Sequence, residues 1–402
     1  MHASPATLLS APFWTSAFRP FYLLGTIYGT LLMLGWAGAY AGLWTPAPGG
    51  LPLMLWHGHE IVFGFACAII AGVVLTALPS WAGTDEIQGG RLALLVGLWL
   101  AGRVACWLLP WIPLPLAAAI DCALFPLLAL MVTPQLARVD NRAYLLLLPV
   151  LAGLCAGNLV FYAGFAESAA RNDALANLGL RIALYAIVLL YVLKAGVLTP
   201  IFTGNVLCET ERGTDIPFNR LLEALSVVSV VLLAVADLAA LPARWIGVAA
   251  ATACVIHAWR LARWRGWLVT DTPLVLVMHL GYAWLVAAFA LKAAAELGAA
   301  APEAAWLHAF TVGALGLMMI GLMTRVALYH TGRGLALPSA MVVAYALMFA
   351  AAALRVAATL LDLGRGALIG SAFLWTAPFL IYLALFWRML VQPSMPRTQA
   401  DE

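Results

Sequence analysis

The sequence Trp56-His57-Gly58-His59-Glu60 opens a long apolar run that continues to Pro79. An apolar run of about 20 residues is long enough to cross the hydrocarbon core of a bilayer as a helix. Ionisable side chains in such a helix are costly, on the order of 2.5–3.5 kcal/mol each for charged types, and they usually serve a function. Two imidazoles and one carboxylate at the mouth of an apolar segment therefore indicate metal or haem ligation.

The spacing of the two histidines limits how they can be used. His57 and His59 are two positions apart, so on a helix their side chains point about 200° from each other. One metal ion cannot easily take both, but each can serve a different site on its own side of the helix. The segment is not a zinc-protease motif, because no second His follows His59-Glu60 at the required spacing.

Similar apolar runs recur along all 402 residues, of which 64% are hydrophobic and 10% are charged. This composition excludes a water-soluble globular protein and predicts an all-α, polytopic membrane helix bundle that forms a single transmembrane domain over residues 1–402. We expect about twelve transmembrane helices, near residues 18–42, 55–79, 91–110, 114–134, 143–163, 178–200, 220–240, 243–264, 274–297, 305–329, 337–361 and 367–391.

Charge and cysteine usage narrow the function. The net charge is +3 and no basic run suggests nucleic-acid binding. The six cysteines are scattered without a Cys-x-x-Cys motif, so we expect neither a disulfide framework, nor a cysteine metal site, nor haem attached in the c-type manner.

Arginine placement predicts the orientation in the membrane. Loops on the side of the termini carry most of the arginines, whereas the opposite loops carry few, chiefly Arg171, Arg181, Arg244 and Arg365. Both termini are therefore predicted to be cytoplasmic. This orientation sorts the histidines by depth into an outer cluster of His57, His59 and His308 and an inner cluster of His279 and His330, which His257 could join although a hydrogen bond between helices explains it more simply.

Four other side chains are candidates for the site. Arg325 could balance the carboxylates of a haem or attract an anion, and Arg19 could do the same. Alternatively, both side chains reach toward the membrane surface. Tyr282, one turn beyond His279, could donate a hydrogen bond into a site. Glu60 could fix which ring nitrogen of a ligand histidine binds a metal.

Lys194 and Asp121 are single charged residues within predicted spans. We expect each to be paired with another side chain or to reach toward the membrane surface, and the alternative is that they belong to a proton path.

A faint internal repeat is also present. His59, Gly64, Gly72 and Gly83 match His308, Gly313, Gly321 and Gly332 at one offset of 249 positions. The flanking segments do not match at that offset, so both an ancestral repeat and coincidence in a Gly-rich membrane chain remain open.

Short motifs over nearly the whole chain carry a resemblance to one family. The chain resembles the NnrS family, with small departures at Ser80 and Gly204. The motifs are Phe18-Arg19-Pro20-Phe21, Trp56-His57-Gly58-His59-Glu60 with Gly64-Phe65, Leu75-Thr76-Ala77, Trp81-Ala82-Gly83-Thr84, Leu98-Trp99-Leu100-Ala101-Gly102-Arg103, Thr199-Pro200-Ile201-Phe202-Thr203, His279-Leu280-Gly281-Tyr282-Ala283-Trp284, His308-Ala309-Phe310-Thr311-Val312-Gly313 and His330-Thr331-Gly332-Arg333.

The resemblance implies a twelve-span protein of the bacterial inner membrane that contains haem b, with copper as a second metal, and that binds and reduces or detoxifies nitric oxide during denitrification and nitrosative stress. Electrons would come from a quinol or a periplasmic carrier, and the enzyme would be a haem-dependent nitric oxide reductase. The alternatives are a transporter that handles metal or haem, and a non-enzymatic nitric oxide sensor or sink.

Within that reading each candidate residue has a role. Glu60 and Arg325 are the candidate catalytic residues. Arg19 and Tyr282 are candidates for contact with the cofactor. The candidate ligands to haem iron or copper are His57, His59, His279, His308 and His330. Imidazole suits both metals, so the residues alone do not assign one metal to one histidine.

Overall fold

In a computed structural model the protein is described over residues 9–44, 50–139, 142–165, 172–298 and 301–396, which leaves Arg171 and its loop outside the description. Within these residues twelve helices are long and apolar enough to cross a membrane, as the sequence predicts. Spans two and ten are each built from three consecutive helical segments. In order the spans are α2 (Phe18–Ala41), α3 (Leu53–His59) with η3 (Glu60–Ala66) and α4 (Cys67–Ala82), α5 (Gly89–Trp107), α6 (Leu114–Cys122) with α7 (Leu124–Leu136), α8 (Leu147–Ala163), α9 (Asp173–Glu209), α10 (Arg220–Leu238), α11 (Ala243–Arg263), α12 (Pro273–Glu296), α13 (Glu303–His308) with η6 (Ala309–Leu315) and α14 (Gly316–His330), α15 (Ser339–Leu360) and α16 (Gly364–Val391).

The chain divides into two compact units. Unit 1 is Met1–Ala186 with Met323–Leu335 and Tyr382–Glu402, and unit 2 is Ile187–Leu322 with Ala336–Ile381. Three of the four divisions fall within α9, α14 and α16 and the fourth lies between α14 and α15, so neither unit is one continuous piece of chain. Each unit is therefore described by its own contacts.

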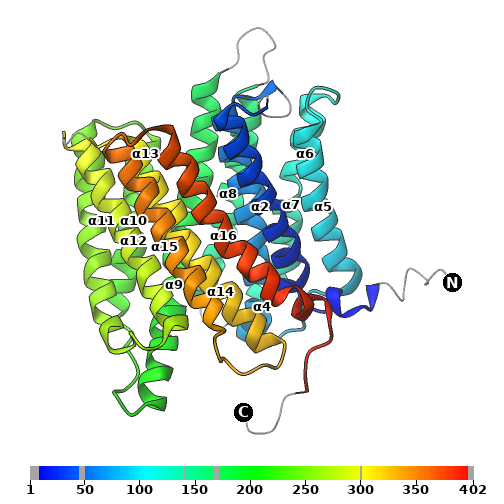
Figure 1. Cartoon of the computed structure of the whole chain (residues 1–402), viewed down its shortest axis with the longest axis vertical. Helices are drawn as coiled ribbons and strands as arrows, with labels where there is room; N and C mark the ends of the chain where they lie inside the picture. Colours follow the sequence, from blue (N-terminus) through cyan, green and yellow to red (C-terminus); the bar gives the residue numbers. More distant parts are fainter. Residues whose placement is uncertain (1–8, 45–49, 140–141, 166–171, 299–300, 397–402) are drawn as a thin grey trace, which may run out of the picture. The chain divides into compact units, whose positions relative to one another are not determined.

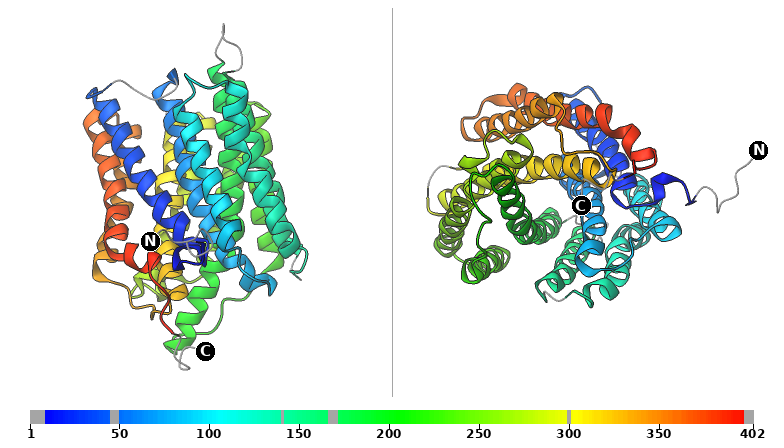
Figure 2. Two further views of the ribbon diagram at one scale, coloured as in Figure 1. Left: turned by 90° about the vertical axis from the view of Figure 1, so that its right-hand side faces the viewer. Right: turned by 90° about the horizontal axis from the view of Figure 1, so that it is seen from below.

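Unit 1 is built around span two. Helix α2 packs against η3 and α4, and α8 packs against α6 and α7. Helices α5 and α6 lie side by side (Figure 1, Figure 2). Arg103 and Asp121 lie in α5 and α6, and this packing brings their side chains to the residues at the start of span two.

Unit 2 has a comparable centre in span ten. Helices α10, α11 and α12 are consecutive neighbours, and α12 and α15 both pack against η6 (Figure 1). Short apolar and small residues dominate η6, with Ala309, Phe310 and Gly313 all buried. Thus the middle of span ten, like that of span two, is enclosed by other helices of its own unit.

Spans two and ten share one unusual feature, a π-helix of seven residues. Each π-helix begins directly after a histidine, His59 in one span and His308 in the other. Both spans are followed by a glycine in the left-handed region, Gly83 with φ 61° and Gly332 with φ 70°. The offset of 249 positions found in the sequence therefore holds for the secondary structure as well, which favours a repeat over coincidence.

One boundary differs from the expectation. The sequence predicts that the sixth span breaks at Thr199-Pro200, but α9 continues through Pro200 to Glu209. Leu207, in the added turns, packs into a buried cluster with Val269 and Val275. Burial of this apolar face stabilises the helix beyond the proline, at which only one backbone hydrogen bond is lost.

Candidate functional site

His59 and Glu60 are fully buried at the junction of α3 and the π-helix η3. The Nδ1 atom of His59 lies 2.8 Å from Glu60 Oε1. Its Nε2 atom lies 2.9 Å from Asn158 Oδ1 in α8 and 3.3 Å from Asp121 Oδ2 in α6. Both ring nitrogens thus face oxygen acceptors. Such an arrangement takes an imidazolium, or a cation in place of one of its protons.

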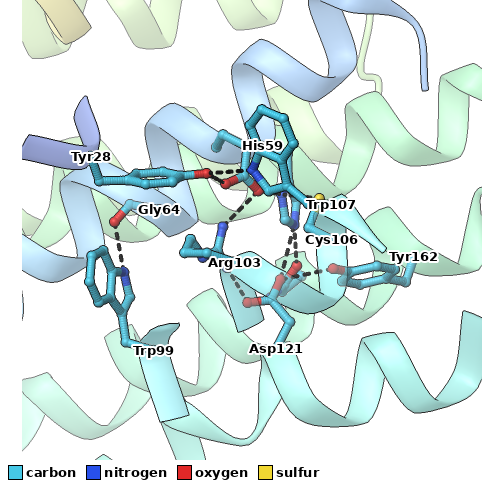
Figure 3. Close-up of polar contacts among 11 residues, drawn as sticks. Tyr28, His59, Gly64, Trp99, Arg103, Cys106, Trp107, Asp121 and Tyr162 are labelled. Carbon is cyan, nitrogen blue, oxygen red and sulfur yellow. Dashed lines mark hydrogen bonds and ion pairs between the residues drawn. The ribbon is translucent and has the colours of Figure 1, made fainter. Parts of the chain in front are cut away.

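Arg103, buried in α5, joins the two carboxylates. Its Nη1 donates to Glu60 Oε1 at 2.7 Å and its Nη2 donates to Asp121 Oδ1 (Figure 3). The other oxygen of Asp121 accepts from Asn158 Nδ2 at 3.1 Å and from the Tyr162 hydroxyl at 3.0 Å. Asp121 is therefore paired with Arg103, as the simpler of the two interpretations of this residue predicts.

The ion pairs around His59 leave the cluster with an excess of negative charge. Glu60 and Asp121 bring two negative charges, and Arg103 brings one positive charge. Uncompensated charge is expensive inside a protein and more so inside a membrane. The cluster therefore calls for one further positive charge, which a proton on His59 or a bound metal ion can provide.

A third donor, Cys106, completes a set that fits a metal ion. Its Sγ atom lies 3.9 Å from His59 Nδ1, and the donor atoms of His59, Glu60 and Cys106 all lie within 4.8 Å of one another. Imidazole, carboxylate and thiolate together suit a transition metal such as copper, zinc or iron. The cysteine comes from α5, so no close Cys pair in the sequence could have signalled it.

Two glycines make room for the cluster. A Cβ at Gly64, in η3, would lie 2.6 Å from the Tyr28 ring and 3.2 Å from Glu60 Oε2. A Cβ at Gly102 would collide with the carboxylate of Asp121. The Tyr28 hydroxyl donates to Glu60 Oε2 (Figure 3). Small residues at these points let the helices approach closely enough for these bonds to form.

His57 faces a different neighbour from His59, as the two-residue spacing predicts. Its ring centroid lies 4.9 Å from that of Trp36 in α2. The side chain is partly exposed, whereas His59 is fully buried. The two histidines therefore do not share one site.

Arg19, His330 and Arg325 also belong to unit 1. Arg19 Nη1 donates to the carbonyls of Met389, Leu390 and Gln392, at 3.0, 3.3 and 2.6 Å, and Nη2 donates to Ser394 Oγ at 2.9 Å. These donors are used on the carboxyl end of α16, where a cation is favourable, so we do not include Arg19 in the proposed site. The ring of His330 lies 5.9 Å from that of Phe18, and Arg325 is partly buried in α14.

In unit 2, Tyr282 and His257 are partners in a buried network. Arg260 Nη1 donates to the Tyr282 oxygen at 2.9 Å, and the Tyr282 hydroxyl lies 2.6 Å from His257 Nδ1. His257 Nε2 lies 3.2 Å from the carbonyl of Ser226, and Arg260 also pairs with Glu223. His257 thus joins helices by hydrogen bonds, and the Tyr282 hydroxyl is used there.

His308 and His279 have contrasting surroundings. His308 Nδ1 lies 2.7 Å from the Ala304 carbonyl, and its Nε2 lies 3.0 Å from Arg355 Nη2. His279 Nε2 lies 2.8 Å from Thr203 Oγ1, and its Nδ1 is buried without a hydrogen-bond partner among the described residues. A haem iron needs a ring nitrogen that is open. His279 fits that requirement as it stands, whereas His59 and His308 would first give up a bond.

Most of the residues that surround His59 and Glu60 were not expected from the sequence. Tyr28, Arg103, Asn158 and Tyr162 surround the cluster, and none was among the candidates. A signal was present in Arg103, a lone cation in the middle of the third apolar run that calls for a carboxylate in a neighbouring span. Which span supplies that carboxylate depends on helix packing, which the sequence does not specify.

Comparison of the chain with protein-family models finds a match. A family model described as "NnrS protein" matches residues 12–394, a range that includes all twelve spans and every candidate histidine. A search of curated proteins finds no match to the chain.

Proposed function

The chain belongs to the NnrS family, and from that premise we propose that it is a redox protein of the bacterial inner membrane that holds haem b and copper, binds nitric oxide and reduces it. Such an activity protects a denitrifying cell against nitrosative stress. The observation that carries the proposal is the buried His59–Glu60–Cys106 donor set, inside a network that is short of one positive charge. A divalent metal ion bound by the Cys106 thiolate brings a net charge of +1 and so provides it.

The proposed ligands differ between the two units. His59 Nδ1, Glu60 and Cys106 would hold copper, and His279 would bind haem iron. When bound, these metals supply a site for nitric oxide and for electrons. Around the first site Arg103, Asp121 and Asn158 hold the ligands in position, as outer partners of metal ligands usually do.

Reduction also consumes protons. Two molecules of nitric oxide, two electrons and two protons give nitrous oxide and water. Glu60 is placed to pass protons toward the site, since its Oε2 accepts a hydrogen bond from the Tyr28 hydroxyl and its Oε1 lies beside His59. With both termini in the cytoplasm the site faces the periplasmic side, and a quinol or a periplasmic carrier would deliver the electrons.

The internal repeat favours one alternative. Transporters are commonly built from repeats with interrupted helices and a central binding site, and spans two and ten share both their π-helix and their preceding histidine. In this reading the protein moves a metal ion or haem across the membrane. A transporter releases its cargo, whereas a redox protein retains a coloured cofactor.

The optical spectrum of the purified protein separates these readings. The protein is purified in detergent from cells grown with haem and copper, and spectra are recorded oxidised, reduced with dithionite, and reduced with nitric oxide in the absence of air. We expect the sharp bands of a reduced b-type haem, shifted by nitric oxide, and copper by elemental analysis. A colourless, copper-free protein would overturn the redox proposal.

A further inference from the structure

Three polar side chains of α9 are buried within unit 2. Tyr191, Thr199 and Thr203 are all buried, and Thr199 and Thr203, four residues apart, lie one above the other on the helix. The hydroxyls of Tyr191 and Thr199 have no hydrogen-bond partner among the described residues, and neither does Nδ1 of His279. Buried polar groups are almost always bonded, so the bare Nδ1 of His279 points to a ligand that the protein chain itself does not provide.

The hydrogen bonds of Thr203 decide the state of His279. The Thr203 hydroxyl donates to the carbonyl of Thr199 at 2.7 Å. Its one proton is thereby used, so its oxygen accepts from the imidazole, with His279 Nε2–H as the donor at 2.8 Å. The proton of the neutral ring thus lies on Nε2. Nδ1 then carries a lone pair, and this is the form in which imidazole binds a metal.

Gly266 keeps the other side of the ring clear. A Cβ at this position would lie 2.5 Å from His279 Nδ1 and 2.7 Å from the ring carbon next to it. Any side chain there would therefore push the imidazole aside. Trp264, two residues earlier, packs edge-on to the ring with centroids 6.2 Å apart.

The other histidines of unit 2 do not offer such an atom. Both ring nitrogens of His257 are bonded, to Tyr282 and to the Ser226 carbonyl. Both ring nitrogens of His308 are bonded as well, to the Ala304 carbonyl and to Arg355. Within unit 2, all of whose histidines are described, His279 alone has an open ring nitrogen.

We propose that His279 ligates its metal through Nδ1, that Thr203 is the positioning residue that presents this nitrogen, and that Gly266 keeps the space for it. The proposal rests on the proposed function and specifies the ligating atom in unit 2. The proposed function assigns this metal as haem iron; a copper ion, which binds the same neutral imidazole, is the other outcome that the test distinguishes. Thr203 acts through His279 and does not touch the metal.

The test uses full-length protein purified in detergent and readouts that need no turnover. Haem is measured as its pyridine complex, copper by elemental analysis, and the ligand field by low-temperature electron paramagnetic resonance. We expect His279→Ala to lose at least 90% of one metal, which identifies it as haem iron or copper. Thr203→Val should shift the resonance of that metal, and Thr203→Ser, which retains the hydroxyl, should restore the wild-type signal.

Gly266→Ala provides a second, independent test. Its methyl group would crowd Nδ1, so we expect the same metal to fall at least tenfold in occupancy. Gly366→Ala is the matched control, because a Cβ there meets nothing within 4 Å. If the wild type holds its metals and all of these variants keep them with unchanged spectra, His279 is not a ligand and its assignment to haem iron is wrong, while the copper site of unit 1 and the redox function stand. A wild type without haem and copper would overturn both.

Discussion

His59 and His308 occupy the same place in two spans and have opposite electrostatic surroundings. Each is the last residue before a seven-residue π-helix. His59 is followed by Glu60, and both of its nitrogens face acid or amide oxygens. His308 is followed by Ala309, and its Nε2 faces the guanidinium of Arg355.

The repeated helix therefore places a histidine at the same position in both spans, but the neighbouring helices decide whether that histidine can bind a metal. In unit 1 Arg103 contacts two carboxylates, so its charge is more than balanced and a cation can be accommodated beside His59. In unit 2 Arg355 donates to the imidazole itself. A metal at that nitrogen would meet a positive charge in its place. Metal binding is therefore expected at His59, and at His308 only if Arg355 moves away.

Removal of the two arginines should have very unequal effects. Arg103→Leu leaves Glu60 and Asp121 buried without their cation, and breaking a buried pair in this way costs about 3–5 kcal/mol. Arg355→Leu removes a hydrogen bond to a neutral ring, for which about 1 kcal/mol is typical. Unfolding in detergent, followed by tryptophan fluorescence against denaturant, measures both. Equal losses would show that the cluster in unit 1 is not electrostatically special.

Copper binding should depend on His59 and not on His308. His59→Asn and Cys106→Ser each remove one of three donors, and we expect copper affinity to fall about 100-fold or more, above the 10- to 100-fold typical of outer partners. His308→Asn should leave copper unchanged. Competition with a copper chelator of known affinity measures the change. If copper binding depended on His308 and not on His59, the assignment of the copper site to unit 1 would be wrong.

The glycines of the two π-helices offer a smaller and more selective change. A Cβ at Gly64 would lie 2.6 Å from the Tyr28 ring, and one at Gly313 would lie 2.5 Å from the Trp284 ring. Both alanine variants should lose about 1–3 kcal/mol of stability, as overpacked cores do. Only Gly64→Ala should also weaken copper binding, because Gly64 borders Glu60. If Gly313→Ala lowers copper equally, the site extends beyond the residues assigned to it.

The fold was largely predictable, because apolar runs of bilayer length are a local property of the sequence. The pair His59 and Glu60 was found for the same reason, as ionisable groups inside an apolar run. The partners of that pair were not found. Asp121 and Asn158 meet through the packing of α6 and α8, and Arg19 reaches Gln392 from the other end of the chain.

The path of α9 beyond Pro200 could not be predicted from the sequence for the same reason, because it depends on packing between helices. Local rules favour a break at the proline, but the helix continues where Leu207 packs against Val269 and Val275. The histidines illustrate it chemically. His279 and His308 look alike in the sequence, but Thr203 and Arg355 give them different ring states, and those partners come from other helices.

The smallest effects are expected in two loops, one in each unit, whose carboxyls should respond to pH with opposite sign. Burial raises the pKa of Glu86 above its usual 4.5, although the nearby Ser16 hydroxyl and the charge of Arg19 act against this. A hydrogen bond from Arg212, 2.9 Å away, lowers the pKa of Asp271 below its usual 3.8. The folded state thus favours the neutral form of Glu86 and the charged form of Asp271.

The sign for each group follows from linkage. The contribution of Glu86 is fully present below pH 4.5 and is lost as pH rises through its raised pKa, so stability should fall over that range. The contribution of Asp271 is present above pH 3.8 and is lost as pH falls through its lowered pKa. We expect Glu86→Gln to flatten the upper slope of unfolding free energy against pH, and Asp271→Asn to flatten the lower slope by less, because Asp271 is exposed and solvent weakens its ion pair. An upper slope that survives Glu86→Gln would assign it to another group.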